Sequence, residues 1–443
     1  MTTKNKHDAL STPDARPPVG TLDLRGMEAS GGGARPCPVQ ADIAARDLHA
    51  LPGTQATQGT TRDGVGRRVC FVGMSNLAVL APEYDRSGAA GEPVQQTLLA
   101  KALARRGYAV TMITADFGQP DGATWEEVKT YKAFDPRAGV PLLRFVHPRW
   151  TGLWSALKRA DADVYYLSCA GAIVGQVAMF CRMHGKRFIY RVASDADCAP
   201  DTLLIKRWYW RDRRMYEYGL RRASGVLAQS ERQQTLLMRN FGVRSSVAGL
   251  LVERARRILP RAERTIDALW VSNIRVVKRP DVLLDVAAML PDIAVHMAGG
   301  TVPGEGSCFD EIRARAQHCA NVTFHGAVPY RDVSALYERA RVFVNTSDIE
   351  GFPNTYLQAW ASGTPVVAFF DPDDLISREG LGIAVRTPQE MADAVRTLVH
   401  DEAQWQASSA RCLAHVARCH GDDTVLRPYL RLVDRGEGRG AAR

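Results

Sequence analysis

The chain has 443 residues, which is enough for two domains of ordinary size with further segments at the ends. A hydrophobic content of 46% and a charged content of 24% are ordinary for a globular protein, and no run approaches the roughly 20 apolar residues of a membrane-spanning helix. The formal charge of +9 favours anionic partners, and the candidate classes are sugar nucleotides, acidic lipid surfaces and nucleic acid.

Both ends of the chain differ in composition from its centre. Residues 1–66 are rich in Gly, Pro, Thr and charged side chains and lack the apolar segment of a signal peptide, so we expect a disordered leader. A disordered tail is expected at 435–443. The 9 cysteines are scattered and odd in number, which suits the reducing cytosol. We predict no metal site, because one C-terminal group of potential ligands lacks the paired spacing of such a site: Cys412, His415, Cys419 and His420.

The first folded segment has the pattern that opens a nucleotide-binding α/β domain. An apolar strand at 69–73 is followed by a Gly-rich loop, a helix at 94–106 and a second strand. The loop lacks the G-x-G-x-x-G spacing, so a dinucleotide cofactor is disfavoured. Small and polar residues stand directly before the helix: Gly88, Gly91 and Glu92.

Strands and helices continue to alternate up to an expected strand at 247–251. The strand at 187–192 leads into a loop that carries Asp195 and Asp197. Loops at the carboxyl ends of parallel strands hold the ligands of α/β proteins, so Asp195 is the first candidate for a site residue here and Asp197 the second. The alternative is that these carboxylates cap the following helix.

The segment 203–222 combines seven basic residues with Trp and Tyr side chains. Aromatic residues beside cations on a helix suit an anionic membrane surface. They equally suit a surface helix whose aromatic residues pack inward, and the sequence leaves both interpretations open.

The stretch 341–369 is the centre of the second half. An apolar strand leads into a turn with Glu350 and Gly351, and Asn354 is expected to cap a short helix that contains Gln358. The N–H groups at the start of this helix favour an anion, and both polar side chains can reach one ligand there. A carboxylate and an amide beside an anion site suggest a ligand with phosphates and hydroxyls. The alternative is that Glu350 and Asn354 only cap the helix.

The motif E-G-F-P-N-x-x-x-Q-A-x-A-x-G-x-P-V-V at 350–367 closely resembles the donor-site signature of glycosyltransferase family four (group 1). Members of that family are retaining enzymes of the GT-B fold, an α/β architecture of two Rossmann-like, doubly wound domains that face a cleft. The resemblance implies a first, acceptor domain at 67–252 and a second, nucleotide-sugar donor domain at 265–420. It also implies that a helix at 421–434 crosses back to the first domain.

The resemblance also assigns roles to single residues. Glu350 lies near the donor sugar and phosphates, Lys278 grips the diphosphate, and Asp195 lies by the acceptor hydroxyl. Gln358 replaces a glutamate that holds the ribose, Asn273 replaces an arginine, and Arg275 lies close enough to substitute for it. The remaining donor-binding candidates are Gly299, Gly300, Val328, Gly351, Phe352, Pro353, Asn354 and Thr355. On the acceptor side the candidates are Gly88, Gly91 and Glu92. The alternative for Lys278 is a plain surface lysine.

Together these patterns predict a metal-independent retaining glycosyltransferase without a cofactor. It moves a sugar from a nucleoside diphosphate sugar to a hydroxyl of a glycan or glycolipid precursor, in cell-surface polysaccharide biosynthesis. The predicted location is the cytoplasm, including the inner face of its membrane. Two rivals share the fold: a nucleotide-sugar 2-epimerase and a catalytically inactive sugar-nucleotide-binding protein. No motif supports a nucleic-acid partner.

Overall fold

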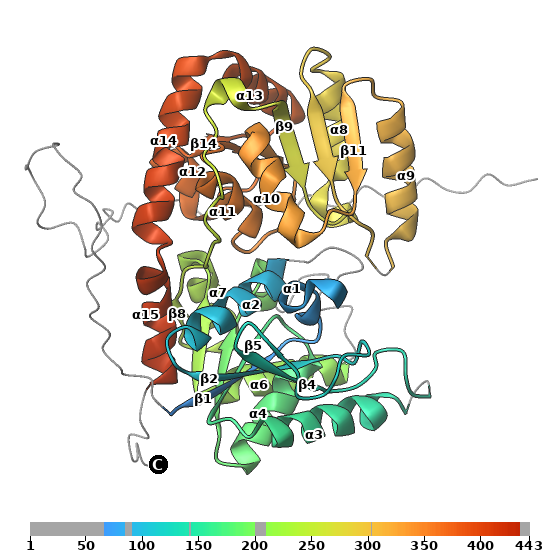
Figure 1. Ribbon diagram of the computed structural model, residues 1–443, viewed down its shortest axis with the longest axis vertical. Helices are drawn as coiled ribbons and strands as arrows, with labels where there is room; N and C mark the ends of the chain where they lie inside the picture. Colours follow the sequence, from blue (N-terminus) through green and yellow to red (C-terminus); the bar gives the residue numbers. More distant parts are fainter. Residues whose placement is uncertain (1–65, 85–90, 141–142, 200–209, 303, 435–443) are drawn as a thin grey trace, which may run out of the picture. The chain divides into compact units, whose positions relative to one another are not determined.

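The computed structural model describes residues 66–84, 91–140, 143–199, 210–302 and 304–434 (Figure 1). The leader predicted at 1–66 (Gly66 apart) and the tail predicted at 435–443 lie outside these ranges. The described residues form one sheet of eight strands and one of six, each flanked by helices, which confirms the predicted α/β class with two Rossmann-like domains. No helix in the described ranges is long and apolar enough to cross a membrane.

The first sheet has the strand order β3-β4-β2-β1-β5-β6-β7-β8. All neighbouring strands are parallel except β3 and β4. The strands are β1 (Arg68–Val72), β2 (Ala109–Thr114), β3 (Thr124–Trp125), β4 (Val128–Lys132), β5 (Val164–Ser168), β6 (Arg187–Arg191), β7 (Gly225–Ala228) and β8 (Ser246–Val247).

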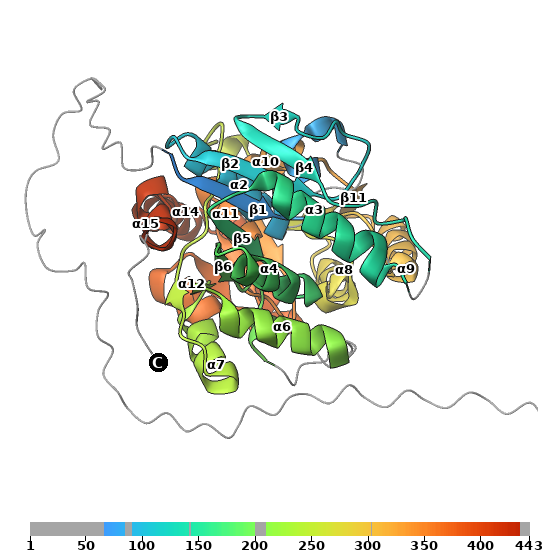
Figure 2. The ribbon, with the colours of Figure 1, turned by 90° about the horizontal axis from the view of Figure 1, so that it is seen from below.

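One face of the first sheet is covered by helices whose apolar sides form a single core with it: α3 (Thr151–Ala160), α4 (Ala172–Met183), α6 (Trp210–Arg222) and α7 (Glu231–Phe241). Figure 2 shows α3, α4 and α6 in this layer. The other face packs against α1 (Leu77–Leu80), α2 (Gly91–Ala104) and α15 (Asp422–Val433). Since α15 buries Val425, Leu426 and Tyr429 on the first sheet, the predicted return of the C-terminal helix to the first domain is confirmed.

The second sheet is parallel throughout, in the order β11-β10-β9-β12-β13-β14. Its strands are β9 (Ile266–Val271), β10 (Val295–Ala298), β11 (Val322–Gly326), β12 (Ala340–Asn345), β13 (Val366–Ala368) and β14 (Gly382–Ala384). One face packs against α8 (Pro280–Ala288), α9 (Gly306–Gln317) and α13 (Pro388–His400). The other packs against α10 (Tyr330–Arg339), α11 (Asn354–Ala361), α12 (Leu375–Glu379) and α14 (Glu402–Cys419).

The prediction of a strand at 247–251 is wrong in its length, because the observed strand β8 covers only Ser246–Val247. The backbone of Leu251 bonds a side chain in place of a strand neighbour. Gln95 Nε2 on α2 donates to Leu251 O at 2.7 Å, and Leu251 N–H donates to Gln95 Oε1 at 3.0 Å. The apolar residues that suggested a strand are thus buried in a connecting segment.

Each sheet reverses its winding direction at its first strand. In the first sheet β2 and β5 lie on opposite sides of β1, and in the second sheet β10 and β12 lie on opposite sides of β9. Such switch points leave a crevice outside the carboxyl ends of the strands, where doubly wound proteins bind ligands. The topology therefore places the expected sites after β1 and β5 and after β9 and β12.

Arg264 is a buried cation that fixes the end of α11. It donates to Ala340 O and Ser362 O at 2.6 Å, to Thr364 Oγ1 at 2.7 Å and to Leu259 O at 3.1 Å. Its guanidinium lies 4.9 Å from the centre of the Trp405 ring. Burial lowers the pKa of Arg264 to about 10, which leaves it charged at neutral pH.

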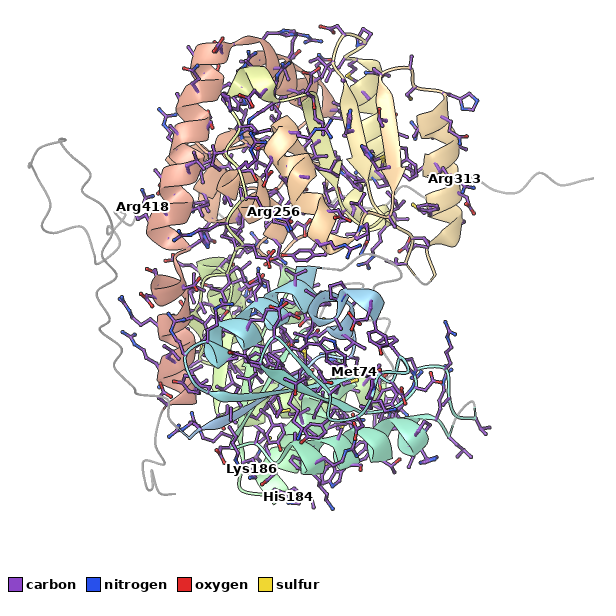
Figure 3. The ribbon with its side chains drawn as sticks, viewed as in Figure 1. Met74, His184, Lys186, Arg256, Arg313 and Arg418 are labelled. Carbon is purple, nitrogen blue, oxygen red and sulfur yellow. The ribbon has the colours of Figure 1, made fainter. Side chains whose placement is uncertain are left out.

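We expect Arg264→Met to lower the free energy of unfolding by about 3 kcal/mol, because two buried carbonyls lose a charged donor. Urea denaturation measures the loss. Arg313→Met is the matched control, since Arg313 lies exposed on α9 (Figure 3), where it pairs with Asp310 at 3.3 Å and lies 5.8 Å from the centre of the Phe309 ring. That variant should stay within about 0.5 kcal/mol of the parent. Equal stability of the two variants would contradict the anchoring role of Arg264.

Candidate functional site

A cavity of about 360 Å³ lies at the carboxyl ends of the strands of both sheets. Its wall contains every predicted site residue except Asp195, the second candidate Asp197, and Gly88, which lies outside the described ranges. The second domain contributes Asn273, Arg275, Lys278, Gly299, Gly300, Val328, Glu350, Gly351, Phe352, Pro353, Asn354, Thr355 and Gln358. The first domain contributes Gly91 and Glu92. Residues more than 250 positions apart in the sequence thus line one crevice at the two switch points.

An ion pair joins the two loops at the switch point of the second sheet. Lys278, in the short helical turn after β9, places Nζ 2.6 Å from Glu350 Oε1 in the loop after β12. Both side chains are largely buried, with 20% and 13% of their surface accessible. Two further bonds hold these loops together, since Thr346 Oγ1 donates to Lys278 O at 2.7 Å and Asp348 N–H donates to Val277 O at 3.1 Å. A carboxylate is thereby held beside a cation in the cavity wall.

The helix after this loop begins one residue earlier than expected. Asn354 is its first residue, Pro353 precedes it, and no side chain caps the start, so the prediction of Asn354 as the N-cap is wrong. The Asn354 side chain reaches across to Gly91 on α2, where a Cβ would lie 2.3 Å from its Nδ2. The first N–H groups of α11 therefore have no side-chain cap, and a free helix N-terminus favours an anion.

Two glycines of the wall are required by close backbone approach. A Cβ on Gly299 would lie 1.8 Å from Ser272 O, so the loops after β9 and β10 meet only with glycine there. A Cβ on Gly351 would lie 2.5 Å from Ala193 O and 2.4 Å from Gln229 Oε1. Gly351 therefore lets the loop after β12 lie directly on the first domain.

Gln229, at the end of β7, holds the same loop from the first domain. Its Oε1 accepts a hydrogen bond from Phe352 N–H at 2.7 Å. A second contact of this kind involves Asp373, whose carboxylate accepts from the N–H groups of Glu231 and Arg232 at 3.1 and 3.4 Å at the start of α7. The loop with Glu350 is thus positioned by the first domain as well as by its own sheet.

Asp195 lies in a neighbouring hollow, outside the main cavity wall. Its carboxylate pairs with Arg232 at 3.1 Å and accepts from Gln233 Nε2 at 3.1 Å. Asp197 takes the capping role, because it accepts from the N–H groups of Ala193 and Ser194 at 2.8 and 3.2 Å. The structure therefore brings the other predicted residues together without either of these carboxylates.

The sequence prediction missed several residues of the wall: Cys169, Arg191, Ser194, Gln229, Tyr330 and Asn345. Arg191 and Asn345 each end an apolar strand, and a polar residue at the carboxyl end of a parallel strand was the available signal. Gln229 follows β7 in the same way. Cys169 likewise comes directly after β5, whereas no local pattern marks Tyr330.

Glu92 lies in the first turn of α2, deep between the domains, although the cavity leaves part of its side chain accessible. Gln96 Nε2 donates to Glu92 Oε1, and Asn76 Nδ2 donates to Gln96 Oε1 at 3.3 Å. Burial raises the pKa of the Glu92 carboxyl to about 7, while the hydrogen bond from Gln96 and the charge of Arg191 act against this rise. The first-domain wall thus carries a carboxyl group that titrates near neutral pH.

The basic segment 203–222 is described only from Trp210 onward. In α6 the residues Tyr216, Gly219 and Leu220 are buried, whereas Trp210 is 71% exposed and lies beside the Arg214 guanidinium at 5.2 Å. The described part therefore packs one side inward and exposes one aromatic residue at its start.

Both domains match the descriptions of known protein families. Residues 91–248 match the family description "Glycosyl transferase 4-like domain", and residues 265–401 match "Glycosyl transferases group 1". The chain therefore belongs to the group 1 glycosyltransferases, with a 4-like first domain.

One relative is the D-inositol 3-phosphate glycosyltransferase of Corynebacterium urealyticum, which is 31% identical over 189 residues. The match covers 39% of this chain and 44% of the relative, so the chain spans less than half the length of that curated relative.

The chain is also similar to solved structures, and at their low sequence identity this similarity concerns the fold alone. Sucrose-phosphate synthase from Thermosynechococcus elongatus superposes with a TM-score of 0.67 at 17% identity, over 83% of this chain and 98% of that one. Anabaena HepE, solved with UDP and glucose, gives 0.61 at 15% identity, over 82% and 98%. The fold is GT-B, as the resemblance implied.

The raised pKa of Glu92 predicts a pH-dependent stability. The folded protein binds this proton more tightly than the unfolded chain, so the group stabilises the fold at low pH, and this contribution is lost as the pH rises through about 7. Between pH 4.5 and 8 we expect the wild type to lose up to about 3 kcal/mol relative to Glu92→Gln.

Urea denaturation across this pH range measures the difference. Glu311→Gln on the exposed side of α9 is the control and should follow the wild type. Parallel curves for the wild type and Glu92→Gln would show that the carboxyl of Glu92 titrates in its ordinary range.

Proposed function

We propose that this protein is a retaining glycosyltransferase that moves a sugar from a nucleoside diphosphate sugar to a hydroxyl of a glycan or glycolipid precursor. The observation that carries the proposal is the convergence of Glu350, Lys278, Arg275 and the uncapped start of α11 on one cavity at the carboxyl ends of β9 and β12. Polysaccharide biosynthesis is the process that we propose for it.

The second-domain wall suits the donor diphosphate. Lys278 and Arg275 supply positive charge, and Arg275 Nε is buried without a partner among the described residues. The start of α11 and the backbone of Gly300 supply N–H groups, whereas the N–H of Gly299 already donates to Gly326 O at 2.8 Å. Gln358 lies in the same wall and can bond a ribose diol through its amide. That HepE was solved with UDP and glucose supports this choice of donor.

The transfer step that we propose keeps the reactants on one face of the sugar. The bond between the anomeric carbon and the phosphate oxygen breaks, and its electron pair stays on the diphosphate. The acceptor oxygen forms the new bond to the same carbon, and its proton passes to the leaving phosphate. The protein mainly orients the reactants and stabilises the charge that develops on the diphosphate, which is the task of Lys278 and Arg275.

Glu350 has a distinct role in this proposal. Its paired carboxylate lies beside the helix start, where the sugar hydroxyls of the donor would lie next to the phosphates. A fixed carboxylate accepts hydrogen bonds from these hydroxyls and sets the orientation of the ring. Independence from metal, and contact with an anionic membrane through 203–222, stay predictions.

A thermal-shift panel of UDP-, GDP-, ADP- and TDP-sugars tests the donor. A ligand that binds only the folded protein raises its melting temperature, so one base should give a clear shift. A panel with no shift for any nucleotide would contradict the proposed donor site.

We expect Glu350→Ala to lower the rate of sugar transfer about 100-fold or more, because the donor loses its orienting carboxylate. Asp348→Ala is the matched control: Asp348 is an exposed carboxylate in the same loop, paired with Arg279 at 3.1 Å. It should keep near-normal turnover, measured as product formed from a radiolabelled donor. Wild-type rates in Glu350→Ala would refute its role.

Lys278→Ala should weaken the binding of the free nucleoside diphosphate about tenfold or more, since a buried cation beside the phosphates is lost. Isothermal titration calorimetry gives the dissociation constant. Lys158→Ala, on the exposed side of α3, should bind like the wild type. An unchanged affinity in Lys278→Ala would remove this residue from the phosphate site.

A further inference from the structure

Arg191 is a buried cation in the first-domain wall of the cavity. It is the last residue of β6, and only 2% of its surface is accessible. Its side chain nevertheless lines the cavity, together with Cys169, Ser194 and Glu92 of the same domain. The position is a carboxyl end of a parallel strand, where ligands of doubly wound proteins bind.

The guanidinium of Arg191 is poorly satisfied by the described residues. Nη1 donates to the Tyr429 hydroxyl at 3.2 Å, and Nε is buried without a partner. Among the described residues no ion pair within 4.0 Å involves Arg191, and Glu92, on the same wall, acts on its charge from a longer distance while it accepts from Gln96. Arg264 offers the contrast, because it is as deeply buried and donates to four oxygens.

A buried guanidinium without an ion-pair partner at contact distance is costly to desolvate, and here the carboxylate of Glu92 acts on it only from farther away. Its planar fork of N–H donors matches an oxyanion with two oxygens, such as a phosphate or a carboxylate. The free donors of Arg191 therefore suit an anion that enters through the cavity.

The donor diphosphate does not account for this anion site. Within the proposed function its charge is met by Lys278, Arg275 and the start of α11, all on the second-domain wall. Arg191 belongs to the opposite, first-domain wall, which is the acceptor side in the proposed function. The anion that it binds is therefore carried by the acceptor.

We propose that Arg191 forms an oxyanion subsite for the acceptor, so that the acceptor carries a phosphate or a carboxylate near its attacking hydroxyl. This inference rests on the proposed function for the assignment of the two walls. A phosphorylated sugar alcohol, a lipid-linked sugar phosphate and a uronic acid all offer the required group. Arg191 is a positioning residue in this scheme, since it holds the acceptor and does not touch the bond that breaks.

Binding to the full chain tests the subsite without the need for turnover. The protein is first saturated with the nucleoside diphosphate that gives the largest thermal shift, so that the donor site is filled. Glucose 6-phosphate, methyl glucuronide and neutral methyl glucoside are then compared by ligand-observed NMR titration. We expect at least one anionic sugar to bind at least tenfold more tightly than the neutral one, and the arm that binds identifies phosphate or carboxylate.

Arg191→Gln should abolish this preference, with at least a tenfold loss for the anionic sugar and an unchanged affinity for the nucleoside diphosphate. Tyr429→Phe is the matched control, because it removes the hydrogen bond that the Arg191 guanidinium makes to the Tyr429 hydroxyl and keeps the cation. It should retain the preference within about threefold, whereas a purely structural role of Arg191 predicts that both variants behave alike. Arg191→Lys, which keeps the charge and loses the fork, should bind with intermediate affinity.

The outcomes separate the two proposals. Equal binding of all three sugars by the wild type, or wild-type preference in Arg191→Gln, overturns the subsite. If Arg191→Gln does not fold, the wild-type preference and its partial loss in Arg191→Lys decide the question. Anion binding without sugar transfer to any acceptor would leave the subsite standing and overturn the transferase. If the protein transfers sugar to neutral acceptors and Arg191→Gln does so at the same rate, the transferase stands and the subsite is overturned.

Discussion

The ion pair between Lys278 and Glu350 joins the loop after β9 to the loop after β12. The chain winds away from these two adjacent strands in opposite directions. Parallel strands bring their carboxyl ends to one edge of a sheet, and β9 and β12 are neighbours in the second sheet. The pair therefore fixes the width of the crevice at this edge. Only 20% and 13% of the two side chains are accessible, so water screens the attraction between the two charges only weakly. Under the proposed function a donor diphosphate would contact the same lysine, which would couple donor binding to the geometry of Glu350.

Deeply buried arginines serve two different purposes in this chain. Arg264 is saturated by carbonyls and a hydroxyl, and its role is to hold the segments around α11 in place. Arg191 has one hydrogen bond and an orphaned Nε, and it faces the cavity. Both guanidinium groups are buried, but they differ in how many of their N–H groups have hydrogen-bond partners. This difference separates a structural cation from one that is available to a ligand.

The C-terminal helix connects the first-domain wall of the cavity with the segment between the domains. Tyr429 on α15 accepts from Arg191 and donates to Gly249 O at 3.1 Å. His420, which ends α14, contacts Leu250 O through Nδ1 at 2.9 Å, and its ring lies 6.0 Å from Phe352 in the donor loop. One short stretch of chain thus contacts both walls of the cavity.

The sequence by itself determined the alternation of apolar strands and amphipathic helices, and with it two doubly wound domains, because these periodicities are local. It also identified the second-domain wall of the cavity, since Glu350 to Gln358 lie within one strand–turn–helix unit and Lys278 follows a recognisable strand. Only the tertiary structure decided which residues form the first-domain wall on the other side of the cavity. Arg191 and Gln229 reach the cavity from other strands, Asp195 turns to Arg232, and Asn354 meets Gly91 in place of capping its helix. These arrangements depend on contacts between residues more than 30 positions apart, and no local pattern of side chains encodes them.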